Sequence, residues 1–308
     1  MNINALATEW IKAMKAKSAT KKRIIKICIS LLLALTVVFA GGIGYKELSK
    51  QNQALEINEY VVMSERLPSA FHGFRIAQVS DLHNAEFGED NEKLLSALAQ
   101  TNADAIVLTG DLADSRRTNT DVAVQFAKKA VEIAPAYYVT GNHESRIDEY
   151  ADLKTDLISC GVTVLENQSV VITKDMQSVR VIGLQDPAFA DKWDKDIQKS
   201  YLKTQLSKFA VGEEYTILLS HRPEFFDVYA EFEADLVFSG HAHGGQIRLP
   251  KIGGLFAPNQ GFFPKYEAGL YEKGQTKMLV SRGIGNSLFP LRINNPPEIV
   301  VVTLFRET

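Results

Sequence analysis

Residues 75–84 read RIAQVSDLHN, an apolar run that passes directly into a cluster of polar side chains. Asp81 and His83 stand two positions apart in that cluster. A short apolar run bounded by turn residues is typical of a strand that is buried on both faces of a sheet. The stretch therefore predicts a central strand that carries metal-binding side chains at its carboxyl end.

The same pattern occurs four more times along the chain. The further apolar runs are residues 105–108, 136–139, 215–219 and 235–238. They are followed by Thr109-Gly110-Asp111, Gly141-Asn142-His143-Glu144, Ser220-His221-Arg222-Pro223 and Gly240-His241-Ala242-His243-Gly244-Gly245. In an open α/β sheet, ligands bind beyond the carboxyl ends of the strands. We therefore expect all five loops to meet at one edge of one sheet.

Helical stretches are expected between these runs, at about residues 91–99, 121–133, 148–159 and 200–209. Alternation of strands and helices indicates a layered α/β domain with parallel strands. Further strands are expected at 57–63, in a hairpin of 170–173 with 179–184, and in a final pair of 278–281 with 299–304. A second sheet packed on the first is the natural place for these additional strands.

Composition limits the classes of partner. The chain has 308 residues and a net charge of −3, so it offers no overall basic surface for nucleic acid, and no such partner is expected. Only six histidines are present, and all except His72 belong to the polar clusters. The two cysteines, Cys28 and Cys160, form no CxxC pair, which gives no indication of redox chemistry or a zinc ribbon.

The polar clusters together predict a site for two metal ions. Asp, His and Asn are ligands that suit Mn²⁺, Fe or Zn²⁺. The candidate ligands are Asp81, His83, Asp111, Asn142, His221, His241 and His243. This set is larger than one ion needs, and it suits two ions about 3.5–4 Å apart. A single such motif is more often a loop or a cap, but five in succession favour a metal site.

The expected charge of this site favours a phosphate substrate. Two divalent ions carry +4, whereas the two aspartates and a hydroxide return −3, which leaves about +1. A phosphate oxygen is then attracted to both ions. The sequence therefore indicates hydrolysis of a phosphoester bond.

Taken together, the five clusters resemble the calcineurin-like metallophosphoesterase superfamily, and the resemblance covers about residues 74–308. The signature of that family is Asp-x-His, Gly-Asp, Gly-Asn-His-Asp/Glu, a later His and Gly-His-x-His, and every block is present in this order. The resemblance is greatest to the bacterial membrane-associated, phosphodiesterase-like branch. It implies a four-layer αββα sandwich of two mixed sheets.

The resemblance also implies the roles of individual residues. The first metal ion is expected on Asp81, His83, Asp111 and His243, and the second on Asp111, Asn142, His221 and His241. His143 and Glu144 are the expected catalytic residues. His143 would protonate the leaving-group oxygen or steady the phosphate, and Glu144 would orient the ring of His143.

Residues 27–45 are nineteen consecutive positions without a charge, preceded by a cluster of lysines and one arginine. As a helix rising about 1.5 Å per residue, they would span roughly 28 Å, close to the thickness of a bilayer core. The excess of basic residues before them places the N-terminus in the cytoplasm and the catalytic domain outside it. A cleaved signal peptide is the open alternative, because small residues follow the apolar run at 40–42.

The domain boundaries that follow are a basic cytoplasmic segment at 1–23, a transmembrane anchor at 24–45, a stalk with the first strand at 46–70, and the metallophosphoesterase domain at 71–308. The expected function is that of a membrane-anchored hydrolase of phosphodiester or pyrophosphate bonds. Its substrate would be lipid-linked or part of the cell envelope, as UDP-diacylglucosamine is. Phosphomonoesterase activity is one alternative, and a metal-stabilised membrane scaffold without turnover is another.

Other residues allow two interpretations each. Arg282 would either clamp a substrate phosphate or form a structural ion pair. Phe256, Phe262, Phe263 and Tyr266 would either form an apolar lip for a lipid chain or pack a long loop. The native metal and the oligomeric state are not indicated by the sequence.

Overall fold

The computed structural model describes residues 52–307 except 211, 213, 287 and 288, together with scattered positions between 8 and 50. The chain divides into two units, residues 1–50 and 51–308. Every described position of the first unit is helical, but much of the expected anchor at 24–45 lies outside the described residues. None of the helices formed by the described residues combines the length and apolar character that a membrane crossing requires.

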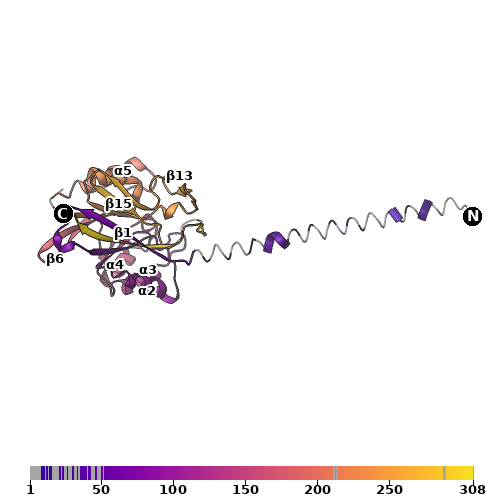
Figure 1. Ribbon diagram of the computed structural model, residues 1–308, viewed down its shortest axis with the longest axis horizontal. Coiled ribbons are helices and arrows are strands. Elements are labelled where there is room, and N and C mark those ends of the chain that lie inside the picture. The colour runs from indigo at the N-terminus through magenta and orange to yellow at the C-terminus, as the bar shows by residue number, and fades with distance from the viewer. Residues whose placement is uncertain are drawn as a thin grey trace, which may run out of the picture. The chain divides into compact units, whose positions relative to one another are not determined.

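Two six-stranded mixed sheets form the second unit (Figure 1). Sheet A has the order β1 (Glu56–Ser64), β16 (Glu298–Arg306), β2 (Phe74–Val79), β3 (Ala105–Thr109), β4 (Ala136–Val139) and β5 (Thr163–Val164). Sheet B has the order β14 (Gly269–Lys273), β15 (Thr276–Val280), β9 (Leu236–Ser239), β8 (Thr216–Leu219), β7 (Gln177–Gly183) and β6 (Gln168–Lys174). The α/β class and the two mixed sheets are thereby confirmed.

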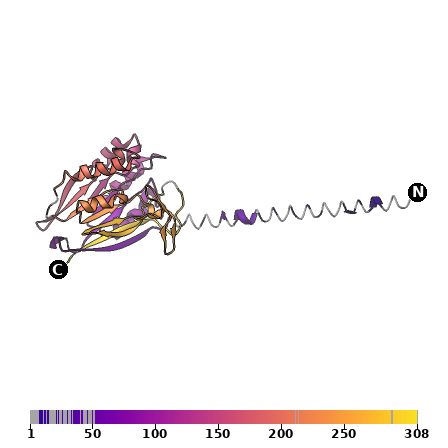
Figure 2. The same ribbon diagram turned by 90° about the horizontal axis from the view of Figure 1, so that it is seen from above.

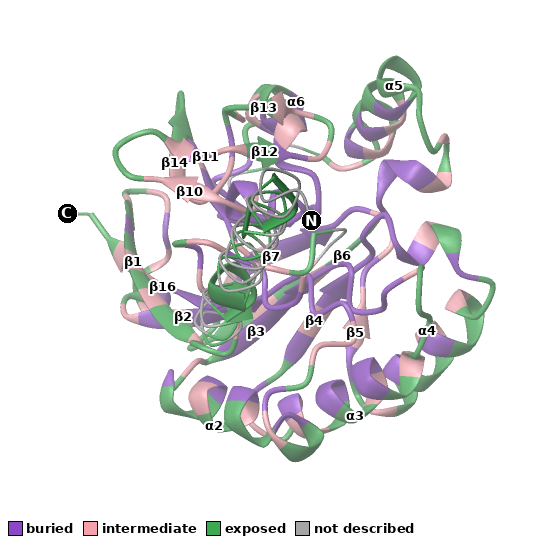
Figure 3. Cartoon of the chain, turned by 90° about the vertical axis from the view of Figure 1, so that its right-hand side faces the viewer, coloured by how far each residue is buried: buried purple, intermediate pink, exposed green. Residues whose placement is uncertain are grey.

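Helices cover the outer faces of both sheets. The helices beside sheet A are α2 (Glu92–Gln100), α3 (Thr120–Ala130) and α4 (Tyr150–Ser159), and those beside sheet B are α5 (Lys195–Leu206) and α6 (Phe226–Glu231). Figure 3 shows the two groups on opposite sides of the molecule. Two small hairpins follow the last histidine cluster, β10 (Arg248–Leu249) with β11 (Gly253–Gly254) and β12 (Phe256–Ala257) with β13 (Gly261–Phe262).

Three hydrophobic cores hold these layers together. The buried residues Val122, Phe126 and Ala130 of α3 recur at helical spacing and pack against sheet A. Between the sheets, Val107 of β3 and Ile217 of β8 belong to a second core. A third core joins sheet B to α5 and α6. The strands between two cores are buried on both faces, which explains their continuous apolar runs.

The expectation that all five motif-bearing strands share one sheet is wrong. β2, β3 and β4 belong to sheet A, whereas β8 and β9 belong to sheet B. A buried side chain links the two groups: Gln78 Nε2 donates to Thr109 Oγ1 of β3 at 2.9 Å and to the Ser239 carbonyl of β9 at 2.8 Å. The carboxyl ends of strands from both sheets therefore meet at one place. An apolar run predicts burial, but it does not indicate the neighbouring strand.

The expected pairing of 278–281 with 299–304 is also wrong. β15 lies between β14 and β9 in sheet B, while β16 pairs with β1 and β2 in sheet A. The parallel pair of β1 and β16, violet and yellow in Figure 2, is nine residues long and joins the two ends of the domain. The strand expected at 57–63 and the hairpin of β6 with β7 are confirmed.

Candidate metal centre

Three of the five loops that carry the candidate ligands, those after β2, β3 and β9, leave their strands through left-handed backbone. Asp81, Asp111 and His243 have φ values of 54°, 52° and 48°. His83 and His241 are also in this region, at 48° and 66°. Residues other than glycine rarely adopt such angles, at a cost of about 1–3 kcal/mol each. A concentration of this strain marks a site whose geometry is maintained by its surroundings.

Two glycines allow the loops to approach one another. A Cβ atom at Gly240 would overlap Ser80 Oγ and the carboxylate of Asp81, and one at Gly141 would overlap the carboxylate of Asp111. These positions require glycine because the backbone of one loop packs directly on the ligand of another. The glycines in the sequence clusters are therefore part of the site's geometry.

The first group of ligands consists of Asp81, His83 and His243, whose ligand atoms all lie within 4.8 Å of one another. Nε2 of His243 lies 3.4 Å from Asp81 Oδ1 and 3.2 Å from Nε2 of His83. Asp81 is held by its neighbours, because Ser80 Oγ and the His241 backbone amide donate to its carboxylate. All three ligands are buried.

The second group consists of Asp111, His221 and His241, again within 4.8 Å. Nδ1 of His221 donates to the Thr109 carbonyl at 2.7 Å, which directs Nε2 toward the site. Asn142 is buried and lines the same pocket as Asp111 and His241, and its Oδ1 has no hydrogen-bond partner among the described residues.

Asp111 connects the two groups. Its Oδ2 lies 3.6 Å from His83 Nε2 and 3.2 Å from His221 Nε2, so this oxygen faces a histidine from each group. Its Oδ1 accepts a hydrogen bond from the His143 backbone amide at 2.8 Å. A carboxylate in this position can bridge two ions. The structure thus brings all seven expected ligands together: six of them form the two groups above, and Asn142 lines the same pocket as Asp111 and His241.

The electrostatics of the site favour the neutral form of three of the four candidate histidine ligands. Burial lowers the pKa of His83 to about 3 and holds the pKa values of His241 and His243 well below the usual range. Their nitrogen lone pairs are therefore available at neutral pH. Burial alone would lower the pKa of His221, but the adjacent Asp111 carboxylate outweighs this effect, and the pKa rises to about 10. His221 therefore carries a proton at neutral pH, and a cation bound between His221 and Asp111 would replace that proton.

The residues present fit a pair of divalent ions. Oδ1 of Asn142 is a buried acceptor without a hydrogen-bond partner among the described residues, and Nε2 of His221 faces the Asp111 carboxylate at 3.2 Å. A buried polar atom without a partner is costly; a cation would satisfy the Asn142 oxygen and take the place of the proton between His221 and Asp111. The donor set of carboxylate, imidazole and amide oxygen suits Mn²⁺, Fe or Zn²⁺.

Glu144 differs from its expected role beside the ring of His143. Its carboxylate accepts hydrogen bonds from the backbone amides of Asp111 at 2.9 Å, Ala113 at 3.2 Å and Gly141 at 2.7 Å. Glu144 is fully buried, so the carboxylate ties together the loops that follow β3 and β4. The structure therefore makes Glu144 a positioning residue for the Asp111 loop.

The ring of His143 has other partners. Its Nδ1 accepts a hydrogen bond from the Ser115 backbone amide at 3.0 Å, and Ser115 Oγ lies 3.1 Å away. Burial holds the pKa of His143 below its usual value, so the ring is neutral. Because Nδ1 is an acceptor, the proton of the neutral ring is on Nε2.

An open pocket of about 100 Å³ lies over the metal residues. Its lining includes Asp111, Asn142, His143, His241 and His243, and also Arg146, Pro258 and Asn259. The last three were not identified from the sequence. Arg146 is exposed and follows the Asn-His-Glu cluster, so its place in that loop could have identified it as a residue of the site. Asn259, whose Nδ2 lies 3.2 Å from His241 Nε2, belongs to no sequence motif and could not have been identified in this way.

Two buried arginines were also missed. Arg222 forms a two-pronged ion pair with Asp186, at 2.9 and 3.1 Å, next to His221. Burial lowers the pKa of Arg292 to about 10, so it remains charged, and it donates to the carbonyls of Arg282 and Gly285. The Gly285 amide in turn donates to the Asp81 carbonyl. Both arginines therefore fix loops that carry ligands.

Two residues with open interpretations are now placed. Arg282 pairs with Glu56 at 2.7 Å and with Glu298 at 2.9 Å. These contacts favour the structural interpretation of Arg282 over a clamp for a substrate phosphate. Tyr266 is buried with Phe226 and Tyr271, so it packs the loop and does not belong to an exposed lip.

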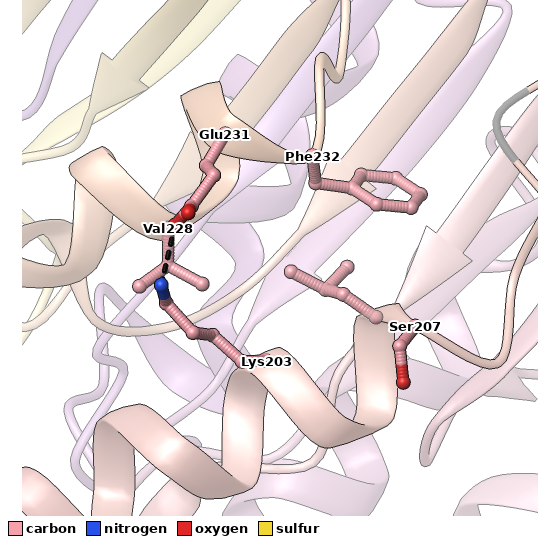
Figure 4. A pocket seen from close by; sticks show the side chains of 6 residues that line it. Lys203, Ser207, Val228, Glu231 and Phe232 are labelled. Carbon is pink, nitrogen blue, oxygen red and sulfur yellow. Dashed lines mark ion pairs between the residues drawn. The ribbon is translucent and has the colours of Figure 1, made fainter.

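A different pocket, of about 230 Å³, lies between α5 and α6 (Figure 4). It is lined by Lys203, Leu206, Ser207, Val228, Glu231 and Phe232. Lys203 and Glu231 face each other across it in an ion pair, the dashed line of Figure 4. No candidate metal ligand is part of its lining, so this groove is not the catalytic centre.

Comparison with known proteins agrees with this geometry. The family model described as "Calcineurin-like phosphoesterase" matches residues 74–245. The "Uncharacterized metallophosphoesterase YkuE" of Bacillus subtilis is 29% identical over 293 residues, which cover 94% of this chain and 98% of the relative. The "Phosphodiesterase YaeI" of Escherichia coli is 28% identical over 237 residues, which cover 75% of this chain and 82% of the relative.

Among solved structures, the phosphopantetheinyl hydrolase of Mycobacterium tuberculosis covers 70% of this chain and 91% of its own, with a TM-score of 0.47 and 14% identity. The family match spans more than half of the sequence and contains all of the predicted ligands. The chain therefore belongs to the calcineurin-like phosphoesterase family and is a metal-dependent phosphoesterase with two His/Asp metal-binding groups.

Proposed function

We propose that this phosphoesterase hydrolyses phosphodiester or pyrophosphate bonds in lipid-linked or cell-envelope substrates, outside the cytoplasm and anchored through residues 24–45. The observation that carries the catalytic part is the Asp111 carboxylate, which joins two ligand groups at the floor of an open pocket. When bound, a pair of divalent ions supplies an activated water and positive charge for phosphate oxygens.

The diester preference is supported by the rim of the pocket and by a relative. Arg146 is exposed beside the metal residues, where its guanidinium can bind a phosphate oxygen that does not reach the ligand groups. The name of the Escherichia coli relative YaeI also specifies a phosphodiesterase.

His143 is the proposed general acid. Because Nδ1 accepts the Ser115 amide, the proton on Nε2 can be given to the oxygen that leaves phosphorus. Leaving groups with a high pKa need this proton, whereas stable phenolates do not. The Ser115 contact therefore determines which ring nitrogen acts.

Membrane anchoring is supported by the uncharged run at 27–45 and the basic residues before it. The same distribution of charge supports a catalytic domain outside the cytoplasm. An anchor of this kind would keep the enzyme close to lipid-linked substrates. The proposed substrate class depends on this proximity.

The first prediction concerns Asp111. Asp111→Ala removes the shared ligand, so we expect bound metal to fall and turnover of bis(p-nitrophenyl) phosphate with Mn²⁺ to drop at least about a thousandfold. Asp156→Ala, an exposed change in α4, should retain full activity. Activity of the Asp111 variant equal to that of the parent would refute the assignment of the site.

The second prediction concerns His143. His143→Gln should lower kcat on an alkyl phosphodiester by about 10²–10⁴-fold but have a much smaller effect on a p-nitrophenyl ester, whose leaving group needs no proton. Rates on a series of esters with increasing leaving-group pKa measure this difference. An equal loss across the series would exclude the acid role.

The third prediction concerns Glu144. Glu144→Gln replaces an acceptor oxygen by an NH₂ group, which cannot accept the amides of the Asp111 and Gly141 loops. Because residues that orient ligands affect metal binding, we expect affinity for Mn²⁺ to fall by about 10–100-fold. Titration of metal-free protein measures the change, and Glu149→Gln at an exposed position is the control. Unaltered affinity would contradict the positioning role.

The fourth prediction concerns topology. A reporter that is active only after export, fused behind residue 308 of the full chain, should be active in bacterial cells. The excess of basic residues before position 27 gives the physical reason. A fusion that is active only as a cytoplasmic reporter would reverse the proposed orientation.

A further inference from the structure

The segment after the last histidines displays large apolar side chains at its surface. Ile252, Phe256, Phe262 and Phe263 are 65%, 47%, 70% and 61% exposed. Residues 252–263 are called here the aromatic loop. Tyr266, just beyond it, is packed in the core against Phe226 and Tyr271, so the segment is folded and holds these side chains outward.

A second loop extends the same surface. The side-chain amide of Gln246 donates to the carbonyls of Phe289 and Leu291, each at 2.9 Å. The backbone amide of Arg248 donates to the Ile293 carbonyl at 2.9 Å. Phe289 is 44% exposed. The segment at 246–248, which leads into the aromatic loop, is thus fixed against the segment at 289–293 that carries Phe289.

The charge displayed by this surface is positive. Residues 252–263 contain no aspartate or glutamate; Glu267, just beyond them, accepts from the Gly254 amide and pairs with Arg248. Lys251 and Lys265, on either side of the loop, are exposed and have no ion pair among the described residues. Exposed aromatic rings combined with lysine and arginine are the features that bind the interface of an anionic bilayer. A protein partner with an apolar patch would not need the basic residues. The observations therefore favour a lipid surface.

The point at which the chain enters the catalytic domain lies at this surface. Asn52 Nδ2 donates to the Pro290 carbonyl at 2.7 Å, and its Oδ1 accepts from the Arg292 amide at 2.9 Å. The uncharged run ends at position 45, which leaves residues 46–51 as the connection. The seven steps from position 45 to Asn52 span at most about 25 Å. An anchor at 24–45 would therefore keep the second loop within that distance of a bilayer.

The aromatic loop also borders the metal centre. Pro258 and Asn259 lie between Phe256 and Phe262 in the sequence and line the metal pocket. Lys195 of α5 donates to the Asn259 carbonyl, which connects the loop to sheet B's outer layer. A bilayer in contact with the aromatic loop would place its phosphate groups near the mouth of the pocket.

We propose that residues 252–263 and 289–291 dock on the surface of an anionic lipid bilayer, so that the pocket receives phosphoesters of lipid headgroups directly from the membrane plane. This inference rests on the proposed function and names its substrate class. The exposed phenylalanines enter the interface, and Lys251 and Lys265 meet the anionic headgroups.

The test uses the full chain with Cys28→Ser and Cys160→Ser, and one new cysteine carrying an environment-sensitive fluorophore. Phe262→Cys and Phe289→Cys report the docking surface. Met176→Cys is the matched control, because it is 99% exposed in the turn before β7, at the opposite end of sheet B from the metal centre. Labelled before reconstitution, the proteins enter phosphatidylglycerol vesicles that contain a nitroxide lipid as quencher.

We expect quenching at 262 and 289 at least about threefold greater than at 176. Lys251→Glu with Lys265→Glu should reduce quenching at 262 in these vesicles but not in phosphatidylcholine. Metal content and turnover of bis(p-nitrophenyl) phosphate show which labelled proteins are folded. If a labelled variant is not folded, Phe263→Cys is used in its place. Equal quenching at 262, 289 and 176 would refute the docking surface.

The possible failures are distinguishable. If the chain resists alkaline extraction but the label at position 262 is not quenched, docking is refuted and the membrane anchor is supported. Extraction by alkali together with strong quenching at 262 before extraction refutes the anchor and supports docking. A folded, metal-loaded parent protein that turns over neither soluble nor lipid-linked phosphoesters refutes the proposed function, whatever the quenching.

Discussion

The contact on which the rest of the site depends is that of Asp111 with histidines from two different sheets. Oδ2 of this residue faces His83, which follows β2 in sheet A, and His221, which follows β8 in sheet B. Neither sheet alone contains a complete set of ligands. The chemistry therefore depends on packing. The core between the sheets must bring the carboxyl ends of strands from both sheets close enough for one carboxylate side chain to reach histidines on each.

This alignment places carboxylates and imidazoles close together, where like groups repel and carboxylates and imidazoles compete for protons. Two buried carboxylates, four buried imidazoles and an amide oxygen occupy a region with little access to water. Burying unpaired polar groups is unfavourable, and several ligand loops adopt left-handed backbone in addition. Cations that bind only the folded chain would offset both costs, so metal binding and folding are coupled. Glu144 and Arg292 hold the ligand loops through backbone groups, which links the strained loops to the rest of the fold.

The chemistry of the site was predictable from the sequence, whereas its architecture was only partly so. Asp81, His83 and the later ligands each follow an apolar run, and this local pattern identified every member of both groups. Strand partners depend on contacts between distant segments, so the division between two sheets and the separate positions of β15 and β16 were not visible. Glu144 could be recognised as important by its place in a motif. Its true partners could not, because backbone amides leave no mark in the sequence.

The aromatic loop follows a similar logic. The composition of residues 256–266 was compatible with core packing and with an exposed lip. In the structure Tyr266, just beyond the aromatic loop, is buried, while Phe262 and Phe263 within the loop are exposed. Exposed phenylalanines reduce solubility unless another surface covers them. The segment that provides His241 and His243 continues directly into this loop. The same stretch of chain thus holds the metal ligands and the apolar surface, so contact with a membrane would act directly on the entrance to the site.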